Sequence, residues 1–213
     1  MAIRSILILS LLMLVACGSD DPTGPVDTNL HSAYFPIGDT LRWVYEHTTD
    51  AAPTVDTVVF TLTKTADSFD SKVLYEYSQF GVANYSLFVD HDTVFSLQYV
   101  AGSDPLPRVF WKPLFSQGDE WDMVGQTYTG PIITFTINNE LLDLSAEVNA
   151  GGIDYRRCLE VQGRYFYFEI AHSYEAYYAR GIGLVYITGS WWNAVEVQEV
   201  VAYEYRLLEF TQQ

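Results

Sequence analysis

Basic side chains are scarce in this sequence, whereas acidic side chains are abundant. The chain holds 11 lysines and arginines against 27 aspartates and glutamates, which gives a formal net charge of −16 at pH 7. A negative field of this size repels the phosphates of nucleic acids and the anionic head groups of lipids. We therefore expect no nucleic-acid partner and no flat adsorption of the chain onto an anionic membrane surface.

Cysteine is almost absent, because the sequence contains only Cys17 and Cys158. If Cys17 carries a lipid, as argued below, Cys158 has no intrachain partner and stability must come from the core instead of a disulfide. Strict strand alternation groups Cys158 with Arg156, Glu160 and Gln162 on the more polar face. A reactive thiol beside arginine is conceivable, but no histidine that could serve as its base is nearby in sequence. We interpret Cys158 as a structural residue.

Histidines are few, and their spacing is not that of a zinc site. They are His31, His47, His91 and His172. The segment Asp90–Asp92 around His91 is the nearest approach to a metal-binding cluster. Adjacent residues on a tight turn rarely converge on one ion, and a calcium loop needs more oxygens at regular spacing. We expect no bound metal.

Motifs of known catalytic sites are also missing. The sequence contains no Gly-x-Ser-x-Gly elbow, no Walker loop, no dinucleotide fingerprint and no His-Glu-x-x-His helix. Asp119 and Glu120 are a conceivable carboxylate pair for glycoside hydrolysis, but neighbours on one strand point to opposite faces. We expect no catalytic residues and no cofactor, and a hydrolase is the least favoured hypothesis.

The only long apolar run lies at the N-terminus and is too short to span a membrane. It extends over residues 6–15, is interrupted by Ser10 and is preceded by one basic residue, Arg4. A helix that spans a membrane needs about 20 apolar residues. The run ends in Leu14-Val15-Ala16-Cys17, which resembles the lipobox of bacterial lipoproteins. The sequence therefore predicts a signal peptide over residues 1–16 and lipid attachment at Cys17. The alternative is an ordinary secretory signal with a coincidental cysteine.

Residues 17–30 are polar and rich in proline, glycine and aspartate. Such a segment cannot bury enough apolar surface to fold. We interpret it as a flexible tether between the lipid and a single β-rich domain over residues 31–213. The tether keeps that domain away from the bilayer surface.

The remainder of the chain alternates with period two and is rich in valine, threonine, tyrosine and phenylalanine, which predicts β-strands. The predicted strands cover residues 41–48, 54–65, 73–80, 85–90, 93–100, 108–111, 132–138, 142–148, 155–162, 165–170, 184–188 and 195–210. Asp90–Asp92 and Gly151-Gly152 fit hairpin turns, and Ser173–Arg180 fits one short helix. With short connections the strands pair antiparallel. We predict an all-β fold, a large twisted meander that forms either a sandwich or a half-barrel.

Two corners of the sequence are similar. Phe35–Asp39 followed by Trp43 resembles Pro113-Leu114 followed by Gly118-Asp119 and Trp121. This pattern suggests that related turns lead into two strands of one fold. It falls short of a repeat architecture.

Clustered aromatic residues are the remaining feature. Tyr165 and Tyr167 face one side of a predicted strand while Phe166 faces the other, so one aromatic row could line a concave surface. The alternative is that both faces are packed. Trp191 and Trp192 fall in a predicted loop, where exposed tryptophans favour a contact surface. These four tyrosines and tryptophans are the candidate binding residues.

Two short motifs resemble those of uncharacterised lipoproteins from Bacteroidetes-like bacteria. The first is Tyr34–Asp39 with Trp43 and Tyr45, and the second is Tyr178–Val185, with glycines at 181 and 183. From the residues alone both motifs are architectural: large buried rings in one, and glycines that allow positive φ or close approach in the other. The resemblance implies a β-rich envelope lipoprotein of unknown activity, distantly similar in shape to the curved half-barrels of lipoprotein carriers.

The residues after Cys17 bear on localisation by analogy. Asp20 and Asp21 loosely resemble a surface-export signal of such lipoproteins, and Gly18 departs from an inner-membrane retention signal. Both analogies imply the outer membrane, with the domain either periplasmic or surface-exposed.

Two functions are therefore expected. The first is a non-enzymatic module that binds a partner protein, glycan or other ligand through loops or an aromatic concave face. The alternative is a carrier of a lipid or other apolar ligand, which requires an apolar cavity of roughly 300 Å³ or more. A solid core would exclude the carrier.

Overall fold

A computed structural model describes residues 33–49, 52–79, 82–99, 103–113, 116–126, 134–167, 170–193 and 198–213. The predicted signal peptide, Cys17 and the tether lie outside these residues. Among the described residues no helix is long and apolar enough to cross a membrane. Only Ala33 and Tyr34 have helical conformation in the described part of the chain.

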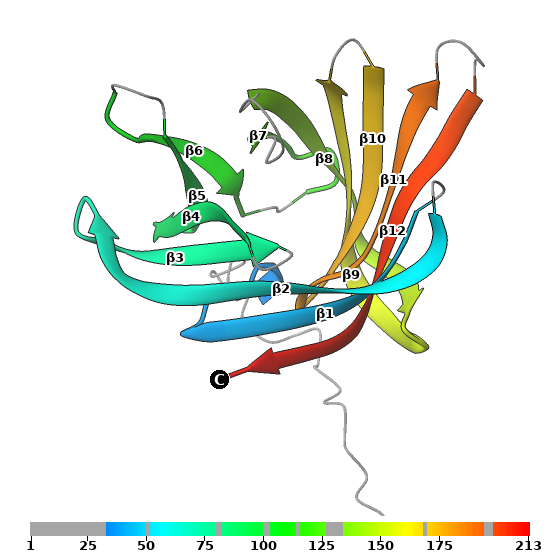
Figure 1. Ribbon diagram of the computed structural model, residues 1–213, viewed down its shortest axis with the longest axis horizontal. Helices are drawn as coiled ribbons and strands as arrows, with labels where there is room; N and C mark the ends of the chain where they lie inside the picture. Colours follow the sequence, from blue (N-terminus) through cyan, green and yellow to red (C-terminus); the bar gives the residue numbers. More distant parts are fainter. Residues whose placement is uncertain are drawn as a thin grey trace, which may run out of the picture.

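Twelve antiparallel strands form one continuous sheet (Figure 1). They are β1 (Thr40–Thr49), β2 (Ala52–Phe69), β3 (Lys72–Gln79), β4 (Val82–Asp90), β5 (Thr93–Gln98), β6 (Leu106–Trp111), β7 (Glu120–Gln126), β8 (Thr134–Ala150), β9 (Ile153–Tyr167), β10 (Ile170–Ala179), β11 (Gly183–Asn193) and β12 (Gln198–Gln212). Each strand pairs with the next along the chain as far as β6, and again from β7 to β12, while β1 pairs with β12.

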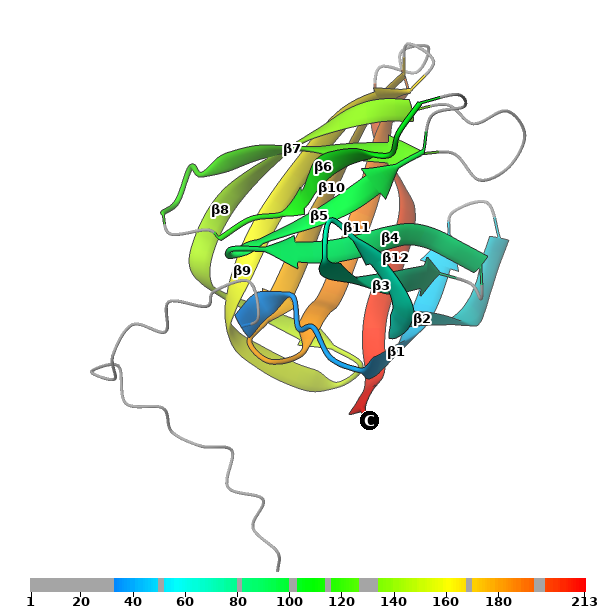
Figure 2. The same cartoon turned by 90° about the vertical axis from the view of Figure 1, so that its left-hand side faces the viewer.

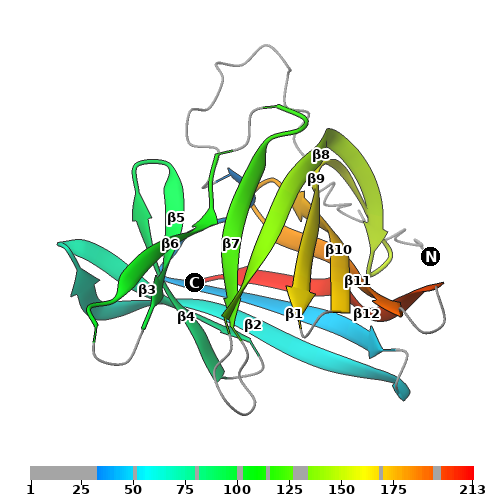
Figure 3. The same ribbon diagram turned by 90° about the horizontal axis from the view of Figure 1, so that it is seen from above.

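The sheet curls until its two edges, β6 and β7, come into contact (Figure 3). The result is a nearly closed, barrel-like sheet. The predicted all-β antiparallel class is confirmed. Of the two architectures left open, the single curled sheet is found, because no second sheet stacks on the first in the described residues.

Both predicted hairpin turns are present. His91, with a φ of 47°, lies between β4 and β5, and Gly151 and Gly152, with φ of 58° and 80°, lie between β8 and β9. Positive φ at these positions matches the right-handed twist of the strands that each turn joins.

The predicted short helix over Ser173–Arg180 is wrong, because these residues lie almost entirely in β10. Glu175, Ala176 and Ala179 are compatible with a helix locally, but β10 pairs along its length with both β9 and β11. Pairing on both sides therefore overrides the local preference.

Two predicted breaks and one predicted gap in the strands are also wrong. The predicted strands 132–138 and 142–148 are one strand, β8, and 155–162 and 165–170 are mostly one strand, β9. Register shifts in the β8–β9 pairing take the place of breaks. Strand β7 falls in a stretch for which no strand was expected.

The two similar corners lead into equivalent strands. The carbonyl oxygen of Asp39 accepts a hydrogen bond from the amide of Lys64 over 2.9 Å, and that of Asp119 accepts one from Leu141 over 2.9 Å. In each case the aspartate precedes the first strand of a six-strand run, β1–β6 or β7–β12, and its partner lies in the second strand. The expectation of related turns is confirmed.

The two motifs of the family resemblance meet in space. Trp43 donates a hydrogen bond from Nε1 to the carbonyl oxygen of Ile182 over 2.6 Å. The amide of Gly181 donates to the carbonyl oxygen of Ala33, which brings the N-terminal helical turn against the β10–β11 turn (Figure 2). Gly181 and Gly183 have φ of 75° and 92°. The architectural interpretation of both motifs is confirmed, although membership of the family stays a prediction.

Cys158 is fully buried in the core, so its predicted place on the polar face is wrong. Arg157 beside it has a φ of 58°, and the pairing with β8 shifts register at this point. A bulge of this kind adds a residue to one strand and breaks the alternation on which the prediction depended. Burial raises the pKa of the Cys158 thiol to about 11, which agrees with a structural role.

Candidate ligand-binding pocket

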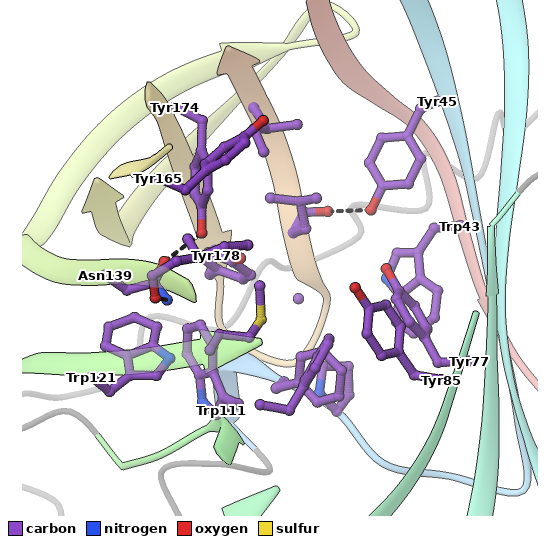
Figure 4. A pocket seen from close by; sticks show the side chains of 18 of the residues that line it. Trp43, Tyr45, Tyr77, Tyr85, Trp111, Trp121, Asn139, Tyr165, Tyr174 and Tyr178 are labelled. Atoms are coloured by element: carbon purple, nitrogen blue, oxygen red, sulfur yellow. Dashed lines mark hydrogen bonds between the residues drawn. The ribbon is translucent and has the colours of Figure 1, made fainter. Parts of the chain in front are cut away.

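The interior of the barrel contains a cavity of about 220 Å³ that is partly open to solvent (Figure 4). Every strand except β2 and β5 contributes to its wall, as does the segment before β1. Most of its lining is aromatic. These rings are Phe35, Trp43, Tyr45, Tyr77, Tyr85, Phe110, Trp111, Trp121, Phe135, Tyr165, Tyr174, Tyr178 and Tyr203.

No aspartate, glutamate, lysine, arginine or histidine is among the described residues that line this pocket. An ion buried there would lose its hydration without gaining a partner of opposite charge, which is costly. The pocket therefore suits an uncharged molecule. The chain keeps its large net negative charge away from this interior.

Cross-strand pairs of glycine with an aromatic residue shape three parts of the wall. The pairs are Gly125 with Phe135, Gly163 with Tyr174 and Gly189 with Tyr203. In each pair a Cβ atom on the glycine would lie within 2.4 Å of the partner's ring. Each ring therefore lies across the bare backbone of the neighbouring strand. This arrangement leaves space in the interior that a larger side chain would fill.

The hydroxyl groups of the pocket tyrosines stay protonated near neutral pH. Burial raises the pKa of Tyr45 and Tyr174 well above the usual value of 10, and it raises the pKa of Tyr178 and Tyr203 in the same direction. These groups are therefore neutral, and they serve as hydrogen-bond donors and acceptors.

Polar groups gather where β7 meets β8. Trp121 and Asn139 are directly paired across these strands. Both residues are buried, with exposures of 7% for Trp121 and 2% for Asn139. The hydroxyl of Tyr174 donates a hydrogen bond to Oδ1 of Asn139. Trp121, Asn139 and Tyr174 thus form one polar part of the lining, and Figure 4 shows the hydroxyl groups of Tyr77 and Tyr85 on the opposite side of the pocket.

Indole rings from both edge strands close the seam of the barrel. Trp111 of β6 and Trp121 of β7 lie with ring centroids 5.5 Å apart in an edge-to-face arrangement. Trp111 also contacts Tyr178 of β10, with centroids 4.6 Å apart. Side-chain packing therefore continues the pocket wall across the junction of β6 and β7.

Of the predicted binding residues, Tyr165 lies in the pocket wall, where its ring stacks on that of Phe135 at 5.0 Å. Phe166 points away and is 73% exposed, so the expected division of the two faces is confirmed at these positions. Tyr167 pairs through its backbone with Ile170. The side chain of Tyr167 lies outside the described residues.

The predicted loop at Trp191 and Trp192 is wrong, because both residues lie in β11. Strand β11 continues through Gly189 and Ser190, so that Trp191 pairs with His172 of β10 and Val200 of β12. Their side chains lie outside the described residues. A contact surface at these tryptophans stays a prediction.

The residues considered as a metal cluster, Asp90–Asp92, and as a catalytic carboxylate pair, Asp119 and Glu120, are not part of any metal-binding group among the described residues. Among the described residues no three histidine, cysteine, aspartate or glutamate side chains are grouped so as to hold a metal ion. His91 contacts Asp90 over 3.1 Å with its side chain 95% exposed. Asp119 accepts a hydrogen bond from the amide of Ser116, as part of the corner before β7.

Most of the pocket residues were not identified from the sequence as binding residues, although Trp43, Tyr45 and Tyr178 stood out as parts of two motifs. Trp121 and Met123 alternate with the exposed Asp122, which is a period-two signal of a strand within the sequence itself. No local signal places Tyr77 of β3 beside Trp43 of β1, however, because this contact depends on the curvature of the sheet.

A scan against models of known protein families and a search of curated proteins find no match to this sequence. Two solved structures have a distantly similar shape. One is a proposed exported protein with a YmcC-like fold from Bacteroides fragilis, with 13% identity over 84% of this chain and 99% of that chain and a TM-score of 0.44. The other is a proposed lipoprotein from Parabacteroides distasonis, with 12% identity over 84% and 99% and a TM-score of 0.46. A likeness this distant carries no argument about function.

Proposed function

We propose that this chain is a lipid-anchored envelope protein that binds one small, uncharged, apolar ligand inside its barrel. The observation that carries the binding function is the aromatic cavity of about 220 Å³, in which none of the described lining residues is charged. An apolar cavity of about 150 Å³ in another protein binds benzene. The interior therefore suits a molecule of one or two rings.

The size of the cavity narrows the carrier hypothesis. At about 220 Å³ it is smaller than the roughly 300 Å³ at which pockets for drug-sized ligands begin. A whole membrane lipid does not fit inside. We therefore propose that the ligand is a compact molecule and not a lipid. We also propose that it binds in the barrel interior and not at the loops.

Binding is favoured over catalysis because of the chemistry of the lining. Besides its carbon-rich side chains, the described part of the pocket lining offers phenol hydroxyls, indole nitrogens and the amide of Asn139, but no carboxylate, imidazole, amine or thiol. These groups can hold and orient a ligand. A general acid–base or nucleophilic reaction would need groups that the lining does not supply.

The anchor rests on the sequence around Cys17. A lipid on this thiol and the tether over residues 17–30 would hold the barrel at a bacterial membrane, which we propose is the outer membrane. The ligand would then be captured close to the envelope, either in the periplasm or at the cell surface.

Indane, a neutral hydrocarbon with one aromatic and one five-membered ring, tests the pocket. We expect isothermal titration of the full chain to detect one site. Ile187→Trp fills the cavity from its wall and should abolish binding. Ile153→Trp is the matched control, since Ile153 is 51% exposed outside the pocket lining. Unchanged affinity of Ile187→Trp, or no binding to the wild-type chain, would refute the proposal.

A further inference from the structure

We infer that the ligand carries an uncharged hydrogen-bond acceptor, such as a carbonyl oxygen, which the indole N–H of Trp121 receives inside the pocket. This inference rests on the proposed function and adds the chemical class of the ligand. It commits to a ring-sized apolar body with one acceptor directed at the β7–β8 wall.

The first observation is an unpaired donor. Nε1 of Trp121 is buried and has no hydrogen-bond partner among the described residues, and Trp121 as a whole is 7% exposed. Buried indole N–H groups usually find a partner, because an unmade hydrogen bond in such a place is costly. A ligand oxygen at this position would supply the missing acceptor.

Another tryptophan of the pocket lining, Trp43 of β1, provides an internal comparison. Nε1 of Trp43 donates to the carbonyl oxygen of Ile182 over 2.6 Å. The backbone of the fold therefore satisfies the indole N–H of Trp43 and leaves that of Trp121 for a different partner. The difference between the two tryptophans lies in their partners, since both rings line the cavity and both are buried.

The second observation is a neighbouring donor. Asn139 is paired directly opposite Trp121, and its Oδ1 is engaged by the hydroxyl of Tyr174. Among the described residues its Nδ2 reaches only the carbonyl oxygen of Ile137, over 3.5 Å, which is long for a hydrogen bond. An amide nitrogen carries two donors, so this group retains donor capacity beside the indole.

Together these groups select an acceptor and exclude an ion. At the β7–β8 wall the groups with spare capacity, Trp121 Nε1 and Asn139 Nδ2, are donors, and no cation among the described lining residues could balance a carboxylate or phosphate. A neutral carbonyl satisfies the donors without bringing a charge into the interior.

The test compares 1-indanone with indane, because these molecules have the same ring skeleton and differ in one carbonyl group. We expect the full wild-type chain to bind 1-indanone about tenfold more tightly than indane, since a buried donor gains its partner. In Trp121→Phe the ratio should fall to about one. Tyr99→Phe is the matched control and should keep the wild-type ratio, because Tyr99 is 62% exposed and lies outside the pocket lining.

Each outcome decides a separate point. Equal affinities for the two probes in the wild-type chain, or a ratio that Trp121→Phe leaves unchanged, would overturn the inference and leave the pocket itself intact. If the wild-type chain binds neither probe, the proposed function fails and the inference with it.

A second measurement does not depend on a folded variant. The indole ¹H–¹⁵N resonance of Trp121 in the wild-type chain should move downfield with 1-indanone and should not do so with indane. The resonance of Trp43 should show no such difference. Downfield shifts of the Trp121 resonance that are equal for both probes would overturn the inference.

Discussion

Tyr45 of β1 donates a hydrogen bond from its hydroxyl to the carbonyl oxygen of Leu184 in β11, over 2.8 Å and across 139 residues of sequence. The parallel contact from Trp43 to Ile182 spans the same sequence separation. Two side chains of β1 thus bond to the β10–β11 turn and to the start of β11. These bonds link the N-terminal and C-terminal halves of the barrel, and Trp43, Tyr45 and Leu184 are themselves part of the pocket lining.

Replacing Tyr45 with phenylalanine should destabilise the fold. Tyr45 is 1% exposed, so the change would leave the carbonyl of Leu184 buried without its partner, which costs about 1–3 kcal/mol. Urea unfolding monitored by circular dichroism measures the difference. Tyr99→Phe is the matched control, because Tyr99 is 62% exposed and the change should have almost no effect. Equal unfolding midpoints for Tyr45→Phe and the wild-type chain would contradict this prediction.

A methyl group at Gly163 should be poorly tolerated. Its Cβ would lie 2.2 Å from the ring of Tyr174, and overpacking of this kind costs about 1–3 kcal/mol. We expect Gly163→Ala to lower the free energy of unfolding by that amount. In a Tyr174→Ala background the ring is gone, so the same change at Gly163 should cost much less. An identical cost in both backgrounds would show that the close approach of ring and glycine is not the cause.

Local features of the fold were predictable from the sequence, since they depend on residues close together in the chain. Alternating tyrosines and valines indicated the strands, and Gly151-Gly152 indicated a hairpin because glycine readily adopts positive φ. The bulge at Arg157 was not predictable, because no local pattern places a positive φ at an arginine. For that reason the orientation of Cys158 was wrong.

The pocket was less predictable than the strands that form it. Tyr165 was identified, since alternation alone separates its face from that of Phe166. Trp121 was not identified as a pocket residue, because its place in the lining depends on its pairing with Asn139 and on the closure of the sheet at β6 and β7. These are properties of register and curvature, and they involve residues that are distant in the chain.

The thiol of Cys158 should react slowly in the folded chain. Burial raises its pKa from 9.0 to about 11, so the thiolate fraction at pH 8 falls by about a hundredfold relative to the unfolded chain. Alkylation by iodoacetamide, followed by mass spectrometry of the peptide that contains Cys158, should be slower by at least that factor than in urea. Similar rates in both states would contradict the burial of this side chain.

The same shift predicts a change of stability at alkaline pH. The folded pKa of Cys158 lies above the unfolded value, so its contribution is fully present below about pH 9 and is lost as the pH rises through about 11. The free energy of unfolding should therefore fall over this range. The decrease should be smaller in Cys158→Ala, and an equal decrease in both chains would assign the effect to other groups.

Lipidation should depend on one of the two cysteines. Cells grown with an alkyne-labelled fatty acid should produce labelled wild-type protein, and Cys17→Ser should abolish the label because the thiol that accepts the lipid is missing. Cys158→Ser is the matched control and should stay labelled, since Cys158 is buried in the core. If Cys17→Ser retained the label, or if the wild-type protein never acquired it, the lipoprotein assignment would be wrong.

The pocket should discriminate strongly against negative charge. Indane-1-carboxamide and indane-1-carboxylate have nearly the same size and shape, but only the second is an anion at pH 7. With no cation in the described lining to balance it, burying the carboxylate costs several kcal/mol, so we expect at least about thirtyfold weaker binding than for the amide. Raising the salt concentration from 50 mM to 500 mM should leave the affinity of the neutral amide within about twofold, because no ion pair is involved. A carboxylate that bound as tightly as the amide would place an unrecognised positive group in the interior, and it would remove the main argument for an uncharged ligand.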